Sequence, residues 1–348
     1  MRQVVSRDRY RRLLQAITIA AFGLIAGPVS AGDSTLRMSH WLPPNHPIAT
    51  QALKPWMESI TAQSGGSITF EVFPAGQLGK AEDHYDLARD GIADVAWLNP
   101  GFNAGRFPVF AATQIPMTIS DGIRGMAGVN DFYGRYAAVE MPDTRFCLAN
   151  VLAPISFYST KRVEKPSDLV GLKVRPSSAM EATFIRAAGG STVAGANPEA
   201  REMLSRGIID ASTGVPNSNI LFGVTEVTQH VLDMPFAAVV FALVINKDSY
   251  DAMNSDQKAV IDTHCSSEAA LRFFSAPQEI ELQGLQRIRA EGKLDIVTPP
   301  ATALAEWKAL SDTVVTQWKA DVRARGLEPD SILSDLQSAL RARNALIE

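Results

Sequence analysis

The sequence GLKVRPSSAMEATFIRAAGGSTVAGANPEAREMLSRGIIDASTGVP, residues 171–216, alternates short extended runs with helical ones. Lys173 to Arg175 predicts a strand that ends at Pro176, because proline cannot donate to a sheet ladder. The residues after it predict, in order, a helix over 179–188, a strand over 191–194, a helix over 197–206 and a strand over 208–210. Two successive strand–helix–strand units indicate a parallel sheet with right-handed crossovers.

Arg175 ends the first of these strands, and Ser212 to Gly214 follow the third. Ligands of such sheets bind beyond the carboxyl ends of the strands, so we expect both segments at one crevice. A guanidinium group is a planar fork that suits bidentate binding of a carboxylate. From the residues alone, a structural ion pair between Arg175 and a surface acid is the alternative.

The residues before this stretch follow the same strand–helix order. Strands are predicted over 34–41, 67–73 and 93–98, with helices between them, which is typical of a parallel α/β sheet. Residues 144–153 and 156–159 predict strands that lead into a second lobe. The apolar run 239–246 predicts a strand buried on both faces that returns to the first lobe.

We therefore predict an α/β protein of two lobes, each a mainly parallel sheet flanked by helices and joined by hinge strands. Lobe I comprises residues 32–154 and 240–285, and lobe II comprises residues 155–239 and 286–348 with the C-terminal helices. One long helical region is expected from Ser255 to about Glu291. Several chain crossings between lobes act as a hinge, and closure over a ligand is the usual consequence.

Residues 1–31 have the layout of a secretory signal: a basic head with five arginines, an uncharged apolar run over 13–27, and the small residues Val29-Ser30-Ala31. A buried N-terminal helix is the alternative. Arg11-Arg12 leaves both the general and the twin-arginine export routes open. No later stretch is long and apolar enough to cross a bilayer, so we expect a soluble periplasmic protein.

Charge and cysteine content narrow the possible partners. Without residues 1–31 the formal charge falls from −4 to −8, and no basic stripe remains, which argues against nucleic acid. An oxidising compartment permits a disulfide between Cys147 and Cys265. Two buried thiols are the alternative, and the sequence leaves both open.

Further candidates for the crevice follow predicted strand ends in either lobe. Trp41 and Trp97 each end a strand of lobe I, and an indole offers a flat apolar wall, although core packing explains such residues equally well. Asn45 and His46 follow Trp41, and Asn99 follows Trp97; a helix cap or a surface position is the alternative for them. The candidates of lobe II are apolar walls mixed with amide or hydroxyl groups: Phe157, Ser177, Val215, Asn217 and Phe236.

Motifs of catalysis or metal binding are not found in the sequence. The histidines have no HExxH spacing, and neither a GxSxG elbow nor a Walker loop occurs. We therefore predict no catalytic residue, no cofactor and no protein metal site. A secreted enzyme acting on a carboxylate is the minor alternative.

Seven segments resemble the substrate-binding protein of tripartite ATP-independent periplasmic (TRAP) transporters, the DctP-type family. Their order and spacing cover nearly all of the chain after residue 31. The segments are HWLPPNHP (40–47), SGGSITFEVFPAGQLG (64–79), LARDGIADVAWLNPGFNAGRFP (87–108), FYSTKRVEKPSDLVGLKVRP (157–176), GGSTV (189–193), NPEAREMLSRGIIDAS (197–212) and VTQHVLDMPFAAVVFALVINKDSY (227–250).

The resemblance implies a two-lobed α/β fold with hinge strands and a long helix across both lobes. It implies capture of an organic acid for a sodium-driven permease built from a small and a large membrane subunit. Arg175, the arginine of GLKVR, is the residue that would pair with the substrate carboxylate. Some relatives bridge the ligand with a divalent cation, and some dimerise; the sequence decides neither.

Two positions depart from the family pattern. Sialic-acid-binding relatives carry a second arginine where this chain has Ser156. Many relatives read DGQEN where this chain reads DASTG (210–214). Gly214 therefore stands in place of an asparagine that contacts the carboxylate in those relatives. The partners of the carboxylate must therefore differ. We predict an aliphatic, keto, hydroxy or aromatic monocarboxylate rather than a sugar acid rich in hydroxyls. An ABC-type or a sensor-kinase-coupled receptor is the alternative interpretation.

Overall fold

The computed structural model describes residues 32–347, so the predicted export signal lies outside the described part. Within this part, nine strands form one mixed sheet in the order β2-β1-β3-β8-β4-β7-β5-β6, with β9 also paired to β8. The strands are β1 Ser34–Ser39, β2 Ile68–Phe73, β3 Val95–Leu98, β4 Thr144–Ser159, β5 Lys173–Arg175, β6 Ser191–Thr192, β7 Ala211–Gly214, β8 His230–Asn246 and β9 Asp295–Val297.

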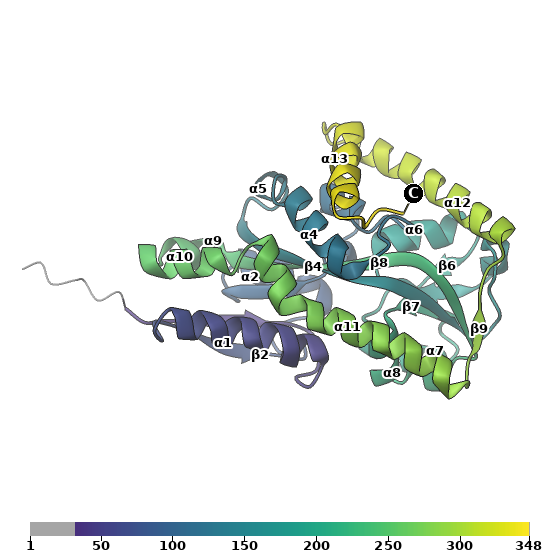
Figure 1. Ribbon diagram of the computed structural model, residues 1–348, viewed down its shortest axis with the longest axis horizontal. Coiled ribbons are helices and arrows are strands. Elements are labelled where there is room, and N and C mark those ends of the chain that lie inside the picture. Colours follow the sequence, from purple (N-terminus) through teal and green to yellow (C-terminus); the bar gives the residue numbers. More distant parts are fainter. Residues whose placement is uncertain (1–31, 348) are drawn as a thin grey trace, which may run out of the picture. The chain divides into compact units, whose positions relative to one another are not determined.

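Two long antiparallel strands, β4 and β8, run through the whole sheet (Figure 1). The C-terminal half of β8 pairs with β3, and β1 pairs in parallel with β2 and β3. The C-terminal half of β4 pairs with β7, and β5 pairs in parallel with β6 and β7. The predicted α/β class is therefore confirmed. Below, lobe I means the elements around β1–β3 and lobe II those around β5–β7; the residue boundaries given above stay a prediction.

Thirteen α-helices flank the sheet within residues 32–347. They are α1 Lys54–Gln63, α2 His84–Arg89, α3 Pro108–Ala112, α4 Gly122–Tyr133, α5 Ala137–Glu140, α6 Ala179–Ala187, α7 Ala200–Ser205, α8 Pro216–Leu221, α9 Lys247–Asp251, α10 Ser255–Thr263, α11 Ser267–Glu291, α12 Ala301–Arg323 and α13 Pro329–Ala342. Short helical turns complete them: η2 Ala49–Leu53, η3 Ala81–Asp83, η4 Pro100–Phe102, η5 Pro166–Leu169, η6 Asn197–Glu199 and η7 Val224–Glu226. None of the helices in this part is both long and apolar enough for a bilayer span.

The helical region expected from Ser255 to Glu291 is two helices, so that prediction was wrong in one respect. The side chain of Ser266 accepts a hydrogen bond from the backbone N–H of Ala269 and caps a new helix, α11. Beside this break, Cys265 forms a disulfide with Cys147 of β4. The cap and the covalent link to the sheet give the chain a fixed break between α10 and α11.

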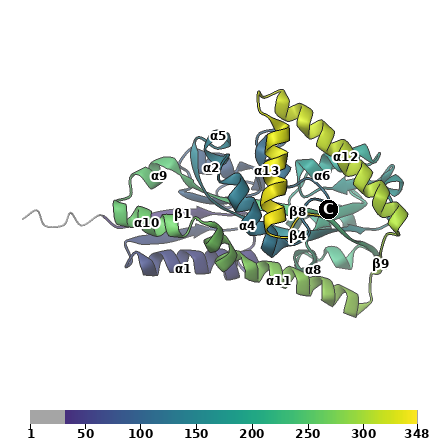
Figure 2. The ribbon, with the colours of Figure 1, turned by 45° about the horizontal axis from the view of Figure 1, so that its top comes forward.

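Helix α11 is the long helix that the resemblance implies. It contacts η2 and α4 at one end of the sheet and α8 at the other, and both views show it running along one face (Figures 1 and 2). Gly284 permits the closest approach, because a Cβ there would lie 2.5 Å from the backbone nitrogen of Asn217. Helix α12 packs on α3 and α6, whereas α13 packs on α4.

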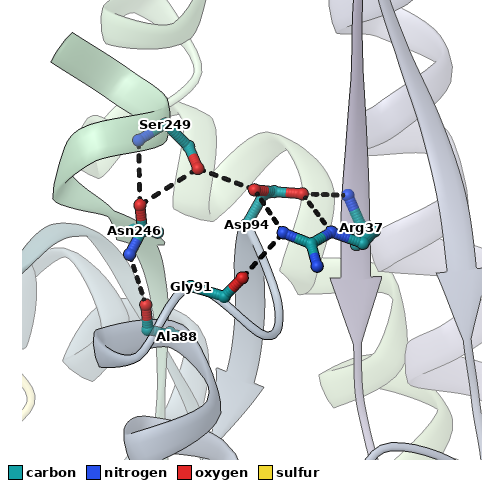
Figure 3. Close-up of polar contacts among 6 residues, drawn as sticks. All are labelled: Arg37, Ala88, Gly91, Asp94, Asn246 and Ser249. Carbon is teal, nitrogen blue, oxygen red and sulfur yellow. Dashed lines mark hydrogen bonds and ion pairs between the residues drawn. The ribbon is translucent and has the colours of Figure 1, made fainter. Parts of the chain in front are cut away.

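A polar network connects several elements of lobe I (Figure 3). Arg37 Nε donates to Asp94 Oδ2 at 2.9 Å, and Ser249 Oγ donates to Asp94 Oδ1 at 2.6 Å. Burial raises the pKa of Asp94, but the hydrogen bonds from Arg37 and Ser249 outweigh it, and the net pKa is lowered. Asn246 Nδ2 donates to the Ala88 carbonyl at 2.7 Å. The network therefore joins β1, α2 and the end of β8 around a charged carboxylate.

Candidate functional site

A cavity lies where the carboxyl ends of β1, β3, β5 and β7 face one another between the lobes. It holds about 460 Å³ of space not filled by atoms, part of which is open to solvent. Its walls carry one positive charge, several aromatic rings and a few amide and hydroxyl groups. The lining residues are Trp41, Leu42, His46, Ile48, Trp97, Asn99, Phe102, Leu152, Arg175, Ser177, Asn197, Gly214, Val215, Ser218, Phe222, Val239 and Phe241.

Arg175 supplies the charge, and only 1% of its surface is exposed. Its Nε donates to the Gly195 carbonyl at 2.8 Å, and its Nη1 donates to the Thr213 carbonyl at 2.9 Å and to Asn197 Oδ1 at 3.2 Å. Its Nη2 takes part in no hydrogen bond with residues 32–347, and no carboxylate of that range lies within 4.0 Å of the guanidinium.

Burial lowers the pKa of Arg175 to about 10, while the nearby carboxylates of Glu181 and Glu199 act to raise it. The side chain therefore keeps its charge at neutral pH. A buried charge without a counter-ion is costly unless a partner of opposite sign is supplied. The unpaired guanidinium thus favours an anion in the cavity.

A buried polar network supports the loop that follows β5. Glu181 Oε2 accepts a hydrogen bond from the backbone N–H of Ser177 at 3.0 Å and another from the hydroxyl of Thr213. The Ser177 hydroxyl lies 3.0 Å from Thr213 Oγ1. Burial raises the pKa of Glu181 to about 7, against the opposing effects of Thr213, Ser177 and Arg175. The network fixes the backbone on both sides of the Arg175 guanidinium.

Three stacked rings form an apolar wall of the same cavity. The ring centroids of Trp41 and Trp97 are 4.4 Å apart, and those of Trp97 and Phe241 are 4.3 Å apart. The indole Nε1 of Trp97 donates to Asn150 Oδ1 at 2.8 Å, away from the cavity. Trp97 therefore offers the cavity an apolar surface only, which suits a flat apolar group.

Two hydrogen bonds connect the lobes at the cavity. His46 Nε2 lies 3.2 Å from Ser218 Oγ, and Asn99 Nδ2 donates to the Ser177 carbonyl at 3.0 Å. Burial, with a further contribution from His40, lowers the pKa of His46 to about 4, so the ring is neutral at pH 7. The polar groups of His46, Asn99 and Ser218 are therefore engaged with the protein itself.

The structure brings many of the predicted site residues to this cavity and leaves others outside it. The predicted residues that line it are Trp41, His46, Trp97, Asn99, Arg175, Ser177, Gly214 and Val215. Asn45 is exposed on the turn before His46. Asn217 is buried against α11 and accepts a hydrogen bond from Arg287 Nη2 at 2.9 Å. Phe157 and Phe236 pack together in the apolar core, away from the lining.

Sequence reasoning did not assign several of the lining residues to the site. Val239 and Phe241 lie two positions apart on β8, and Leu152 of β4 pairs with Val239, so all three share one face of the sheet. Alternation along the predicted strand was the available signal, but the sequence does not tell which face meets the crevice. Asn197 begins the helix predicted over 197–206, and Ser218 lies in none of the strands or helices predicted above, so neither residue carried a signal for the site.

Comparisons with known proteins agree with this geometry. The family model described as "Bacterial extracellular solute-binding protein, family 7" (DctP) matches residues 38–321. The outer membrane transporter protein TsaT of Comamonas testosteroni is 23% identical, over 96% of this chain and 98% of the relative.

Two solved structures resemble the chain in fold. A TRAP solute-binding protein from Rhodoferax ferrireducens in complex with copurified benzoate superposes with a TM-score of 0.84 at 26% identity, covering 89% of this chain and 98% of the other. A marine metagenome TRAP solute-binding protein with 3-hydroxybenzoate superposes with a TM-score of 0.83 at 23% identity, covering 90% and 99%.

The family match and the structural neighbours define a solute receptor of the kind that binds small carboxylates, rather than an enzyme. The chain belongs to the bacterial extracellular solute-binding protein family 7, the DctP-type family predicted from its sequence. Among residues 32–347, no group of three His, Cys, Asp or Glu side chains is arranged to hold a metal ion.

Proposed function

We propose that the solute is an aromatic monocarboxylate whose carboxylate pairs with Arg175 and whose ring lies against the wall of Trp41, Trp97 and Phe241. The observation that carries this proposal is a buried guanidinium that has no carboxylate of residues 32–347 within 4.0 Å and that lines the same cavity as a stack of aromatic rings. Water is excluded as the hinge closes, which strengthens the attraction between guanidinium and carboxylate. Removing one member of such a buried pair costs about 2–5 kcal/mol.

The hydrogen-bonding state of the cavity argues against a solute rich in hydroxyl groups. Apart from Arg175, Asn197 and the indole N–H of Trp41, the polar side chains of the wall already bond to the protein: His46 to Ser218, Asn99 to Ser177, Ser177 to Thr213, and Ser218 to Glu281. A sugar acid would bury several hydroxyls without partners, at about 1–3 kcal/mol for each one. A single carboxylate on an apolar body makes no such demand.

The relatives support the same class of solute. The receptor from Rhodoferax ferrireducens holds benzoate, and the marine metagenome receptor holds 3-hydroxybenzoate. Both solutes are flat monocarboxylates, with one carboxylate to pair with a guanidinium and one ring to lie on an apolar wall. An aliphatic acid of similar size is the competing solute, and it would gain less from the stacked rings.

We infer that the protein works in the periplasm and hands its solute to a permease with a small and a large membrane subunit. The leader-like residues 1–31 and the Cys147–Cys265 disulfide support this placement, since disulfides persist in oxidising compartments. Differential affinity for the closed form is what lets a solute drive the hinge.

Native mass spectrometry of the purified protein, followed by a thermal shift panel, tests the proposal. The panel contains benzoate, 3-hydroxybenzoate, cyclohexanecarboxylate, pyruvate, galacturonate and sialic acid. At a solute concentration of about 100 times Kd, binding adds about 2.7 kcal/mol of stability. We expect the two benzoates to raise Tm most; a rise with galacturonate or sialic acid alone would refute the proposal.

A further inference from the structure

We propose that Asn197 is the second residue that binds the solute carboxylate: its Nδ2 donates to one carboxylate oxygen while its Oδ1 holds Arg175. The inference rests on the proposed carboxylate at Arg175 and deepens it, but it does not require the solute to be aromatic. Asn197 begins the short turn η6 and lines the cavity beside Arg175.

The orientation of the Asn197 amide follows from its neighbour. Arg175 Nη1 lies 3.2 Å from Asn197 Oδ1, and a guanidinium group only donates hydrogen bonds. The amide oxygen must therefore face Arg175, and the NH₂ group faces away from it. In residues 32–347, no hydrogen bond uses this NH₂ group, and it is not among the buried side-chain atoms that lack a partner. Asn197 Nδ2 is thus an accessible, unused donor at the wall of the cavity.

A carboxylate needs more donors than Arg175 alone presents. Its two oxygens offer about four acceptor sites, whereas Nε and Nη1 of Arg175 are occupied by Gly195, Thr213 and Asn197 itself. Only Nη2 remains without a partner in the described chain. A neighbouring amide is the simplest source of a second direct donor.

Position 214 is unable to supply that donor. Gly214 has no side chain, and a Cβ added there would lie 2.8 Å from Asn219 Nδ2, so the space is already occupied. The amide expected at position 214 from the family pattern is therefore absent, while Asn197 presents an amide from another segment of lobe II. The carboxylate would be held by Arg175 and Asn197 together.

The test measures benzoate binding to wild type, Asn197→Ala and Asn197→Thr by calorimetry, with Asn103→Ala as the matched control. Asn103 lies outside the cavity lining, and its Nδ2 donates to the Glu82 carbonyl at 3.1 Å. A hydrogen bond to a charged group predicts about a 10-fold or greater loss for Asn197→Ala. Asn197→Thr, which keeps a hydroxyl donor, should recover part of that loss, and the control should stay within twofold.

A crystal structure with bound benzoate distinguishes a direct contact between Asn197 and the carboxylate from an indirect effect of Asn197 through Arg175. We expect Asn197 Nδ2 within about 3.2 Å of a carboxylate oxygen. A separation above about 4 Å is too long for a hydrogen bond and would overturn the role of Asn197. An affinity of Asn197→Ala within twofold of wild type would overturn it as well. If Arg175→Ala also keeps its affinity, the proposed function fails as well; if Arg175→Ala loses binding while Asn197→Ala does not, only the present inference fails.

Discussion

The Nε2 atom of His46 lies 3.2 Å from Oγ of Ser218, so the turn after β1 is hydrogen-bonded to α8 across the cavity. The Ser218 hydroxyl donates to Glu281 Oε1 at 2.7 Å and therefore accepts from His46. The Nδ1 atom of His46 accepts from the backbone N–H of Ile48 at 3.2 Å, which fits the same neutral tautomer. The lobes are thus held together by their own contacts in addition to any solute.

Ser218→Ala should release the solute faster, because it removes a bond between the lobes. One hydrogen bond is worth about 0.5–1.5 kcal/mol, which predicts a dissociation rate constant roughly 2–10 times larger and a nearly unchanged association rate constant. Stopped-flow displacement of benzoate measures both rates. Ser120→Ala, an exposed serine outside the cavity lining, is the control. An unchanged dissociation rate would show that this contact does not hold the closed form.

Phe241→Leu should weaken binding of aromatic acids more than binding of aliphatic acids. The substitution keeps an apolar side chain on β8 but removes the ring that stacks on Trp97. Aromatic pairs are worth about 0.5–1.5 kcal/mol beyond area burial, so we expect benzoate to lose roughly 2–10-fold. Cyclohexanecarboxylate should lose less. Equal losses for both acids would remove the stacking argument.

Glu181→Gln should change how stability depends on pH. Burial raises the pKa of Glu181 from 4.5 to about 7, so the folded state binds more protons than the unfolded state between these values. The stability that this carboxyl contributes is complete below pH 4.5 and is lost as the pH rises through 7. The variant lacks this loss, and the Gln side chain still accepts from Ser177 and Thr213.

We therefore expect the difference in the free energy of unfolding, Glu181→Gln minus wild type, to become more positive between about pH 5 and about pH 8. The change should be at most about 3 kcal/mol. Urea unfolding at both values measures it. Glu306→Gln, on the exposed face of α12, is the matched control substitution. A difference that is flat with pH, or that decreases, contradicts the assignment.

Gly284→Ala should destabilise the protein, because the added Cβ would lie 2.5 Å from the backbone nitrogen and 2.7 Å from Cα of Asn217. Helices α11 and α8 would have to separate, and such overpacking costs about 1–3 kcal/mol. Chemical denaturation measures the loss. Gln283→Ala on the exposed face of α11 is the control and should be neutral. Equal stability of both variants would show that the two helices move apart freely.

Much of the order of strands and helices followed from local pattern, but β9 was not predicted, and the strand expected over 208–210 is β7, Ala211–Gly214. The position of Arg175 also followed, because a strand ended by proline and a parallel sheet determine which end meets a ligand. Which side chains of β4 and β8 face the cavity could not be predicted from the sequence. The pairing of β4 with β8 shifts between Leu152 and Ile155 and again before Phe157, so simple alternation fails there. Phe157 and Phe236 therefore lie in the core, although both looked suited to the crevice.

The turn before His46 shows the same limit at a smaller scale. The His46 backbone N–H donates to the Pro43 carbonyl, and this turn buries His46 while leaving Asn45 exposed. Neighbouring polar residues in a loop give no sequence signal for which one points inward. The break between α10 and α11 could not be predicted either. It depends on a cap at Ser266 and on a disulfide whose pairing the sequence left open.

Titration of Arg175→Ala with benzoate is the most direct measurement of the central claim, that a buried guanidinium captures a carboxylate between the lobes. We expect a loss of about 30-fold to several thousand-fold in a variant that stays folded by circular dichroism. Arg201→Ala, which removes an exposed arginine paired with Glu226, should bind like wild type. Affinity of Arg175→Ala within threefold of wild type would contradict the account.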